Sequence, residues 1–253
     1  MQFRKECLMK KCVFVYIWMI AILSLINIFP LNRVHAQSGK IKIAELGWNM
    51  PDFTLPAYKG KDVSISDLKG KNVLIVFPRG KADSLHWCNI CQYQYAELAD
   101  LENTQKIREK YNLEILFVLP YDRETVKDWI ETFPSQLEEI EQWKNPPDPA
   151  KLSEGEKKWM EKSRILYPKK FNITKDNIPT PFSILIDAER TVSKGLDLFR
   201  TEWSQSRADQ NIPTIYILDT EGKLVFKYTS QKTTDRPNAD YLSKFIERMI
   251  LKD

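Results

Sequence analysis

The sequence predicts an α/β domain built on one mixed central sheet with helices on both of its faces. Three observations support this prediction. Short apolar runs alternate with stretches of helical periodicity along most of the chain. The chain closes with two strands joined by a tight turn, followed by a last amphipathic helix. Two cysteines, Cys88 and Cys91, directly follow one of the apolar strands, where a helix is expected to begin.

The first 36 residues have the features of an export signal. Basic residues precede an uncharged apolar run over residues 13–31, and Val34-His35-Ala36 offers small residues at a cleavage position. We therefore expect a signal peptide at 1–36. The alternative is an uncleaved membrane anchor formed by the apolar run, which is long for a signal. Both alternatives export the following domain, residues 37–253, to the periplasm or another extracytoplasmic space.

The N-terminal segment also carries the excess positive charge of the chain. It holds five of the 38 basic and one of the 34 acidic side chains, so the remainder has 33 of each. A neutral domain gives no electrostatic argument for nucleic acid as a partner. Cys7 and Cys12 lie in this segment too. The exported domain keeps only Cys88 and Cys91, which in an oxidising compartment can pair only with each other.

The elements of the first half follow from the apolar pattern, taken in chain order. Continuous apolar runs predict two buried strands, and a helical repeat predicts the long helix between them. Proline at 134 is expected to end the next, shorter helix. The expected elements are short strands within residues 50–65, a turn at 66–70, a strand at 73–77, a helix from 89 to about 111, a strand at 113–119 and a helix at 123–133.

Residues 135–177 interrupt this alternation and are expected to form a helical insertion. The run Asn145-Pro146-Pro147-Asp148-Pro149 breaks the chain direction. Ser153 and Glu156 have the spacing of a capping box, which predicts a helix from there to about Tyr167. A solvated insertion is the simpler interpretation, and a lid or a partner surface is the alternative.

The second half of the domain returns to strands. A helix or turn is expected at 192–199, and Asn238 is expected to cap the last helix, whose apolar residues recur at helical spacing. The expected strands are residues 182–186, 212–219 and 223–228, with a hairpin turn at 220–222.

These features resemble a known family. The Trp87-Cys88-Asn89-Ile90-Cys91 motif between strand and helix, Ile212-Pro213-Thr214 before a strand, and the closing hairpin and helix resemble the thioredoxin fold. The lead-in over residues 50–77 resembles the opening of its redoxin, or AhpC/TSA, branch. That branch includes peroxiredoxins and exported thiol–disulfide oxidoreductases of the TlpA/ResA kind. The resemblance covers residues 46–134 and 179–252.

The resemblance implies roles for five residues and no cofactor or metal. Cys88 would be the nucleophile and Cys91 the resolving cysteine, while Trp87, Ile212 and Pro213 would bind substrate. Pro213 would be the family's cis-proline facing the dithiol. Ile178-Pro179-Thr180 offers a second match, but only Pro213 leads into the closing hairpin and helix.

The position of the cysteines has a physical meaning of its own. A helix N-terminus presents unpaired N–H groups and the positive end of the helix dipole, which favour a thiolate over a thiol. Arg79, Lys81 and His86 lie just upstream and could add positive potential.

A proton acceptor for the dithiol is harder to find in the sequence. Val76 and Gln94 stand at positions where relatives carry acids. Asp83 and Glu97 are therefore the remaining candidates.

Three functions compete at this stage. The leading one is an exported thiol–disulfide oxidoreductase that exchanges disulfides with protein or small thiol substrates and depends on an upstream reductant. The second is an antioxidant peroxidase of the peroxiredoxin type, in which Cys91 would be peroxidatic. The absence of an arginine near Pro213 counts against it. The third is Cu(I) binding by the two thiolates and His86.

Overall fold

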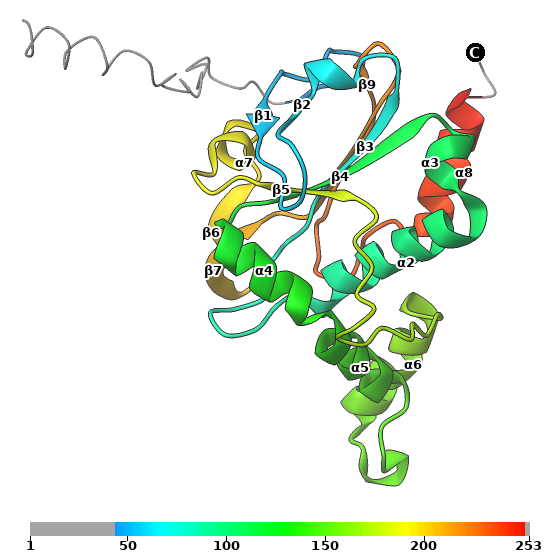
Figure 1. Ribbon diagram of the computed structural model, residues 1–253. Helices are drawn as coiled ribbons and strands as arrows, with labels where there is room; N and C mark the ends of the chain where they lie inside the picture. Colours follow the sequence, from blue (N-terminus) through cyan, green and yellow to red (C-terminus); the bar gives the residue numbers. More distant parts are fainter. Residues whose placement is uncertain (1–43, 251–253) are drawn as a thin grey trace, which may run out of the picture. The chain divides into compact units, whose positions relative to one another are not determined.

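The computed structural model describes residues 44–250 (Figure 1). The predicted signal peptide or membrane anchor lies outside these residues. Within them, no helix combines the length and the apolar character needed to cross a membrane.

A five-stranded mixed sheet forms the centre of the domain, as predicted. Its strand order is β5-β4-β3-β8-β9. The two strands that pair with β3 run in different directions: β4 is parallel to it and β8 is antiparallel. The strands are β3 (Asn72–Phe77), β4 (Leu113–Leu119), β5 (Ser183–Ile186), β8 (Thr214–Leu218) and β9 (Leu224–Thr229).

Alternation along the strands separates two apolar cores. On β3, Leu74 and Val76 face the larger core, while Val73, Ile75 and Phe77 face the other. All six residues of β3 are buried. A strand that is covered on both faces needs a continuous apolar run, which is why the sequence pattern predicted it correctly.

The larger core is covered by most of the helices (Figure 1). Trp129 on α4 and Tyr95 on α2 are fully buried there and meet edge to face with their ring centroids 5.9 Å apart. The helices contributing to this core include α2 (Asn89–Gln105), α3 (Ile107–Lys110), α4 (Arg123–Glu131), α5 (Phe133–Lys144) and α8 (Ala239–Ile250).

The opposite face of the sheet is covered by the N-terminal lead-in and by α7 (Thr191–Gly195). The lead-in contains the short antiparallel pair β1 (Thr54–Leu55) and β2 (Val63–Ser64), followed by the 3-10 turn η1 (Ser66–Leu68). Backbone bonds from Tyr58 N to Ile184 O and from Ile186 N to Pro56 O attach this segment to the edge strand β5. The open edge of β5 is thereby covered.

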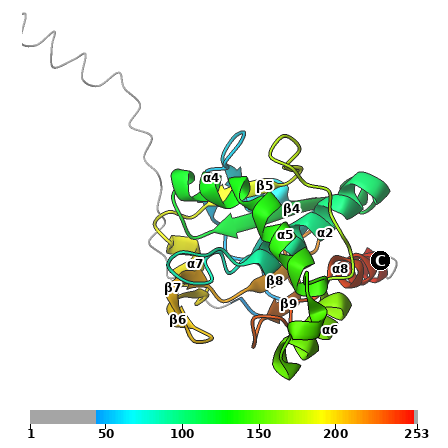
Figure 2. The same cartoon turned by 90° about the horizontal axis from the view of Figure 1, so that it is seen from below.

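The insertion forms helices, as expected. After α5 and the short 3-10 turn η2 (Pro149–Lys151), α6 runs over Glu154–Leu166. Both halves of the Ser153–Glu156 capping box are present. α5 packs against α2 and α6 packs against α5, so the insertion lies beneath the helical layer (Figures 1 and 2).

Two local expectations were wrong, and one pair of strands was not predicted. The helix after the cysteines ends at Gln105, because Lys106 adopts a left-handed conformation with φ 51°. Pro134 lies in the first turn of α5, where its missing N–H costs nothing. It therefore stands at the start of a second helix, directly after α4, and does not end helical structure. The sequence also gave no sign of the hairpin β6 (Phe199–Trp203) and β7 (Ser206–Asn211).

Candidate functional site

The two cysteines lie at the start of α2, one helical turn apart. Cys88 is the residue that caps the helix, with φ −82° and ψ 96°, and Cys91 is within its first turn. The Cys88 N–H donates to Gly80 O at 2.8 Å, and the Cys91 N–H donates to Cys88 O at 2.9 Å. These bonds fix the strand–loop–helix geometry that the motif predicted.

Both cysteines are free thiols and both are buried. Cys88 retains 3% of its surface and Cys91 none. The Arg79 backbone N–H donates to Cys91 Sγ at 3.2 Å, so the inner sulfur is held against the loop that follows β3. Of the two residues, only Cys88 keeps any exposed surface.

Arg236, which the sequence reasoning missed, is the charged group beside the outer sulfur. It belongs to the segment between β9 and α8, and its Nη2 lies 3.7 Å from Cys88 Sγ. Its Nη1 donates to Thr233 O at 3.1 Å. The two residues are 148 positions apart, and Arg236 belongs to no motif. No local signal in the sequence could have joined it to the cysteines.

The two thiols differ strongly in acidity. The pKa of Cys88 is held well below its usual value, first by the hydrogen bond from the Cys91 thiol and then by the charges of Arg236 and Arg79, against the effect of burial. Burial, followed by that same hydrogen bond, raises the pKa of Cys91 well above its usual value. Both shifts favour a thiolate on Cys88 over one on Cys91.

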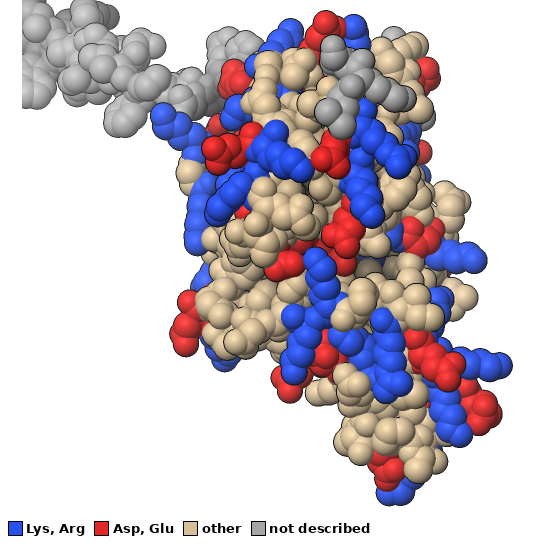
Figure 3. All heavy atoms as spheres, turned by 90° about the vertical axis from the view of Figure 1, so that its right-hand side faces the viewer, with Lys and Arg blue, Asp and Glu red and all other residues tan. Residues whose placement is uncertain are grey.

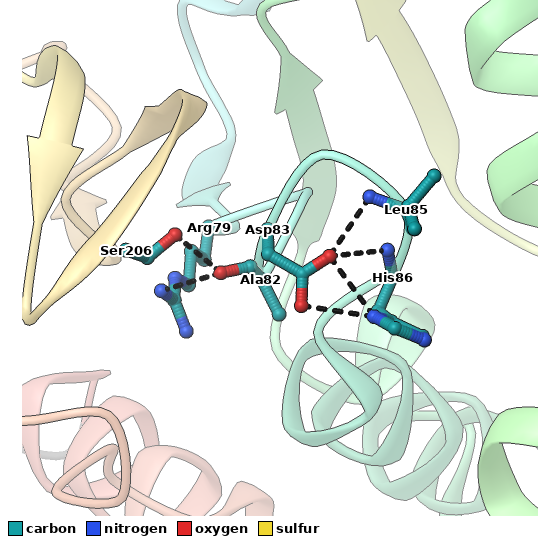
Figure 4. Close-up of polar contacts among 6 residues, drawn as sticks. All are labelled: Arg79, Ala82, Asp83, Leu85, His86 and Ser206. Atoms are coloured by element: carbon teal, nitrogen blue, oxygen red, sulfur yellow. Dashed lines mark hydrogen bonds and ion pairs between the residues drawn. The ribbon is translucent and has the colours of Figure 1, made fainter.

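The loop between β3 and α2 is held by the hairpin that the sequence did not predict. The Arg79 guanidinium donates from Nε to Gln210 Oε1 at 2.7 Å. It also donates from Nη2 to Ala82 O at 3.0 Å (Figure 4). It also lies over the Trp203 ring, 5.4 Å from the centroid. Ser206 donates to Ala82 O as well. The β6–β7 hairpin thus orients Arg79 beneath the dithiol.

Asp83 and His86 stabilise the loop between β3 and α2. Asp83 Oδ1 accepts bonds from the backbone N–H groups of Leu85 and His86, at 2.8 and 2.9 Å (Figure 4). His86 Nδ1 lies 2.9 Å from both carboxylate oxygens. The two side chains are exposed. The proposal of Asp83 as a proton acceptor was therefore wrong, because its carboxylate is committed to closing a turn.

Trp87 is a packing and anchoring residue in this structure. Its indole N–H donates to Asp128 Oδ2 at 2.8 Å, and its ring meets Tyr121 edge to face at 5.5 Å. It is 5% exposed, so little of the ring is available to a substrate. Lys81 Nζ lies over the ring, 5.0 Å from its centroid.

The expected cis-proline is absent from residues 44–250. No peptide bond in that range is cis, so the Ile212–Pro213 bond is trans. The Ile212 N–H donates to Leu198 O and Pro213 O accepts from Ser230 N. The backbone of both residues is thus used within the domain, and a trans bond is the ordinary form for X–Pro. This removes the conformation on which the substrate-binding role of Pro213 was predicted.

Glu97 is the second acidic residue that the sequence offered as a proton acceptor for the dithiol. It is 6% exposed and lines a small pocket of about 30 Å³ together with Arg236, Tyr167, Ile90 and Asn238. Burial raises the pKa of Glu97 to about 7. Gln94, one turn earlier, donates to Pro237 O at 3.0 Å, and Val76 is part of the apolar core. Glu97 therefore stays a candidate.

A metal centre finds no support in the described part of the chain. No group of three or more His, Cys, Asp and Glu side chains gathers there in a way that could hold an ion. His86, the third ligand considered for Cu(I), is paired with Asp83.

Gly80 allows a close approach that the site requires. It has φ +80°, and a Cβ at this position would lie 2.3 Å from Tyr121 Oη. Tyr121 accepts from Lys81 N and donates to Asp209 O, so its ring cannot easily move. We predict that Gly80→Ala lowers the free energy of unfolding by at least about 1 kcal/mol more than Gly222→Ala. Denaturant titration measures both.

Gly222 is the matched control for this prediction, since it has φ +83° and open space around its Cα. Both variants suffer the same backbone strain, and only one meets Tyr121. Equal destabilisation would show that the contact with Tyr121 is unimportant.

Arg236 gives a prediction about pH. Replacement Arg236→Gln removes a positive charge beside Cys88 Sγ, so the thiolate loses a stabilising partner and the pKa of Cys88 rises. The thiolate absorbance in the ultraviolet, followed against pH, measures the shift. Arg207→Gln is the control, because Arg207 is 86% exposed. An unchanged titration in the Arg236 variant would contradict the electrostatic account.

Comparisons with known proteins agree with this fold. Residues 46–138 match the model of the AhpC/TSA family. No curated protein matches the sequence. A mutant of peroxiredoxin 6 from Arenicola marina is 13% identical, with a TM-score of 0.51 over 82% of this chain and 74% of its own. The yeast mitochondrial 1-Cys peroxiredoxin is 13% identical, with a TM-score of 0.50 over 83% of this chain and 78% of its own.

At 13% identity, the likeness to these structures shows the fold alone. The family match covers the segment that carries both cysteines. That match supports an oxidoreductase as the general class of activity. Over residues 46–138 the chain is therefore similar to the AhpC/TSA family, and over its described length it shares the fold of the peroxiredoxin structures.

Proposed function

We propose that this chain is an exported thiol–disulfide oxidoreductase in which Cys88 is the nucleophile and Cys91 the resolving cysteine. The observation that carries the proposal is the environment of Cys88. Its sulfur lies at a helix N-terminus and is 3.7 Å from the Arg236 guanidinium. Each of these contacts favours the thiolate, which is the form that attacks a disulfide.

The reaction takes place in two exchange steps. The Cys88 thiolate attacks one sulfur of a substrate disulfide, forms a mixed disulfide, and releases the other substrate sulfur as a thiolate. Cys91 then loses its proton and attacks Cys88 Sγ, which releases the second substrate thiol and leaves a Cys88–Cys91 disulfide. The substrate gains two electrons and the protein loses them. A separate reductant, supplied by a partner, must then restore the dithiol.

The acidity difference suits this order of events. Cys91 holds the proton that stabilises the Cys88 thiolate, and burial keeps it protonated in the resting state. Once Cys88 has formed the mixed disulfide, its sulfur is no longer a thiolate and no longer stabilises the proton on Cys91. Deprotonation of Cys91 then becomes the step that needs a base. Glu97, with a pKa raised to about 7, is the titratable carboxylate in the adjoining pocket.

Export is proposed on the composition of the chain. The apolar segment within residues 1–36 has the form of a signal peptide or membrane anchor, and the two cysteines after it form a single possible pair. The substrates would then be disulfides of proteins or small thiols outside the cytoplasm.

The roles of the two cysteines predict opposite behaviour of their serine variants. Cys91→Ser keeps the nucleophile and lacks the resolving thiol, so it should accumulate a mixed disulfide with oxidised insulin chains. Cys88→Ser should accumulate at least tenfold less, because the remaining thiol is buried and its pKa is raised. Non-reducing electrophoresis and mass spectrometry of the adduct measure both.

Two controls accompany this experiment. The Cys88→Ser/Cys91→Ser double variant reports non-specific adducts, and unfolding curves of all three variants report whether the domain is intact. Trapping by Cys88→Ser alone would reverse the assigned roles. Trapping by neither variant would contradict the proposed activity.

A peroxidase is the second candidate, and Arg236 is the observation that favours it. Peroxidases of this branch place an arginine beside the reactive cysteine, which the sequence did not offer near Pro213. Arg236 supplies such a group from a different part of the chain. It lies beside Cys88, however, whereas the peroxidase pattern assigns the reactive position to Cys91.

Hydrogen peroxide consumption separates the two candidates. If the chain is a thiol–disulfide oxidoreductase, we predict that the reduced protein reacts with an aromatic disulfide at least a hundredfold faster than with hydrogen peroxide. Stopped-flow fluorescence at equal concentrations of the two oxidants measures both rates. The reverse ratio, retained in Cys88→Ser, would establish Cys91 as a peroxidatic cysteine instead.

A further inference from the structure

Gln210, on β7, is a fully buried amide whose two ends are both hydrogen-bonded. It is 0% exposed. Its Oε1 accepts from Arg79 Nε at 2.7 Å, and its Nε2 donates to Ala208 O at 2.9 Å. The second bond ties the amide to the backbone of its own strand, so the amide is held in one orientation. Its oxygen is therefore aimed at the Arg79 guanidinium.

Arg79 is a buried cation whose contacts are with neutral groups. It is 6% exposed, and its guanidinium contacts the Gln210 amide and lies over the Trp203 ring. It also donates to Ala82 O (Figure 4). A buried charge is usually paired with an opposite charge. These contacts fix the guanidinium and leave its charge uncompensated.

The acidic residues beside this contact in the sequence are used elsewhere. Asp83, in the same loop as Arg79, accepts the backbone bonds that close a turn. Asp209, the neighbour of Gln210, pairs with Arg190 at 2.6 Å. In the described part of the chain, Arg79 takes part in no ion pair with an acidic side chain. Its charge is therefore free to act on the dithiol.

The backbone of Arg79 and Gly80 contacts both cysteines. The Arg79 N–H donates to Cys91 Sγ at 3.2 Å. Gly80 O accepts from the Cys88 N–H at 2.8 Å. β7 pairs with the same stretch of chain, because Gly80 and Gln210 form an antiparallel bridge. The hairpin thus holds this stretch beside the dithiol through its backbone and, at Gln210, through a side chain.

We propose that Gln210 is a positioning residue of the dithiol, which fixes Arg79 beside the cysteines and leaves its charge free to stabilise the Cys88 thiolate. The proposal rests on the oxidoreductase function above, because the thiolate is the form that attacks a disulfide. A glutamate at position 210 would accept the same bond more strongly, but it would pair with the charge of Arg79. The neutral amide supplies the geometry of an ion pair without that neutralisation.

Other groups that carry charge or titrate also face the two sulfurs. After the hydrogen bond from the second thiol, the Arg236 charge lowers the pKa of Cys88 more than the Arg79 charge does. The hydroxyls of Tyr121 and Tyr167 interact with both cysteines as well, but burial raises the pKa of each, so both stay neutral. Loss of the fixed Arg79 should therefore weaken the thiolate, while Arg236 still stabilises it in part.

The pH dependence of the reaction with dithiodipyridine tests the proposal on the reduced full-length protein. This uncharged aromatic disulfide releases a coloured thiol on attack. Gln210→Leu removes the acceptor for Arg79 and adds no charge, so the midpoint of the pH–rate profile should move to higher pH. Rates below the midpoint should fall by roughly threefold or more, and the plateau above it should stay within about twofold, because the attacking thiolate is the same.

Gln210→Glu separates the position of Arg79 from its charge. The variant keeps the size of the side chain and the bond to Arg79, and it pairs the guanidinium with a carboxylate. Its midpoint should move at least as far as that of Gln210→Leu. An unchanged midpoint would show that Cys88 does not respond to the Arg79 charge and would overturn the proposal. Because Glu fills the same space as Gln, this variant also decides the matter if Gln210→Leu fails to fold.

A double-variant cycle shows whether Gln210 acts through Arg79. Arg79→Gln alone should move the midpoint to higher pH, and Arg79→Gln/Gln210→Leu should have the same midpoint as Arg79→Gln. A further rise in the double variant would mean that Gln210 acts by another route, and the positioning role would be wrong.

Gln92→Leu is the matched control. Gln92 is also 0% exposed and donates to neutral groups, the Trp129 carbonyl at 2.5 Å and Thr132 Oγ1 at 3.0 Å. Its replacement should lower the free energy of unfolding, as Gln210→Leu does, and leave the midpoint unchanged. A rise in the midpoint of similar size in Gln92→Leu would reduce the effect at Gln210 to general loosening of the domain and overturn the proposal.

Failure of the proposal can be told from failure of the function. The thiolate absorbance in the ultraviolet, titrated on the same variants, reports the pKa of Cys88 without any substrate. If the unmodified protein reacts and the Gln210 variants keep its midpoint, the positioning role is wrong while the oxidoreductase function stands. If the unmodified protein does not react with dithiodipyridine, the oxidoreductase function falls, and the ultraviolet titration alone supports or overturns the role of Gln210.

Discussion

The contact between the Arg236 guanidinium and the Cys88 sulfur is the interaction on which the rest of the site depends. A thiolate that retains 3% of its surface has lost most of its hydration. Burial alone would return it to the thiol. The helix N-terminus, the Cys91 thiol and Arg236 replace the lost water with fixed donors and a charge. Any element that holds one of these groups therefore contributes to the reactivity of the sulfur.

The sheet and the loop provide that support from opposite sides. β3 delivers the loop at its carboxyl end, and Gly80 O fixes the Cys88 N–H at 2.8 Å. The close approach of Gly80 to Tyr121 leaves no room for a side chain. The β6–β7 hairpin holds Arg79 through Gln210 and Trp203. The reactive end of the helix is thus fixed by backbone contacts, while its charges come from Arg79 in the preceding loop and from Arg236, 148 positions away in the chain.

The sequence was sufficient for the fold and for the cysteines, and insufficient for what surrounds them. Continuous apolar runs predicted β3 and β4, and the Ser153–Glu156 spacing predicted the start of α6, because these signals are local. The β6–β7 hairpin turns at Ser204 and Gln205, both with positive φ. Asn-Gly is the dipeptide that usually marks such a turn in a sequence, and it is not present there. Arg236 and Tyr167 reach the site only through tertiary packing, and no spacing in the chain records that. The trans bond before Pro213 follows from its surroundings, which a short motif does not encode.

The charge balance also bears on the direction of electron flow. On the face shown in Figure 3, basic and acidic side chains are interspersed, so the surface there adds no strong field of one sign. After the hydrogen bond from Cys91, the charges of Arg236 and Arg79 lower the pKa of Cys88 against the effect of burial. Both charges stabilise the reduced form, since only the thiolate is negative, and neither interacts as favourably with a neutral disulfide. A dithiol whose reduced form is stabilised has a higher reduction potential and is a stronger oxidant. These two charges therefore make the dithiol a weaker reductant of its substrate, and they ease the later step in which a partner restores the dithiol.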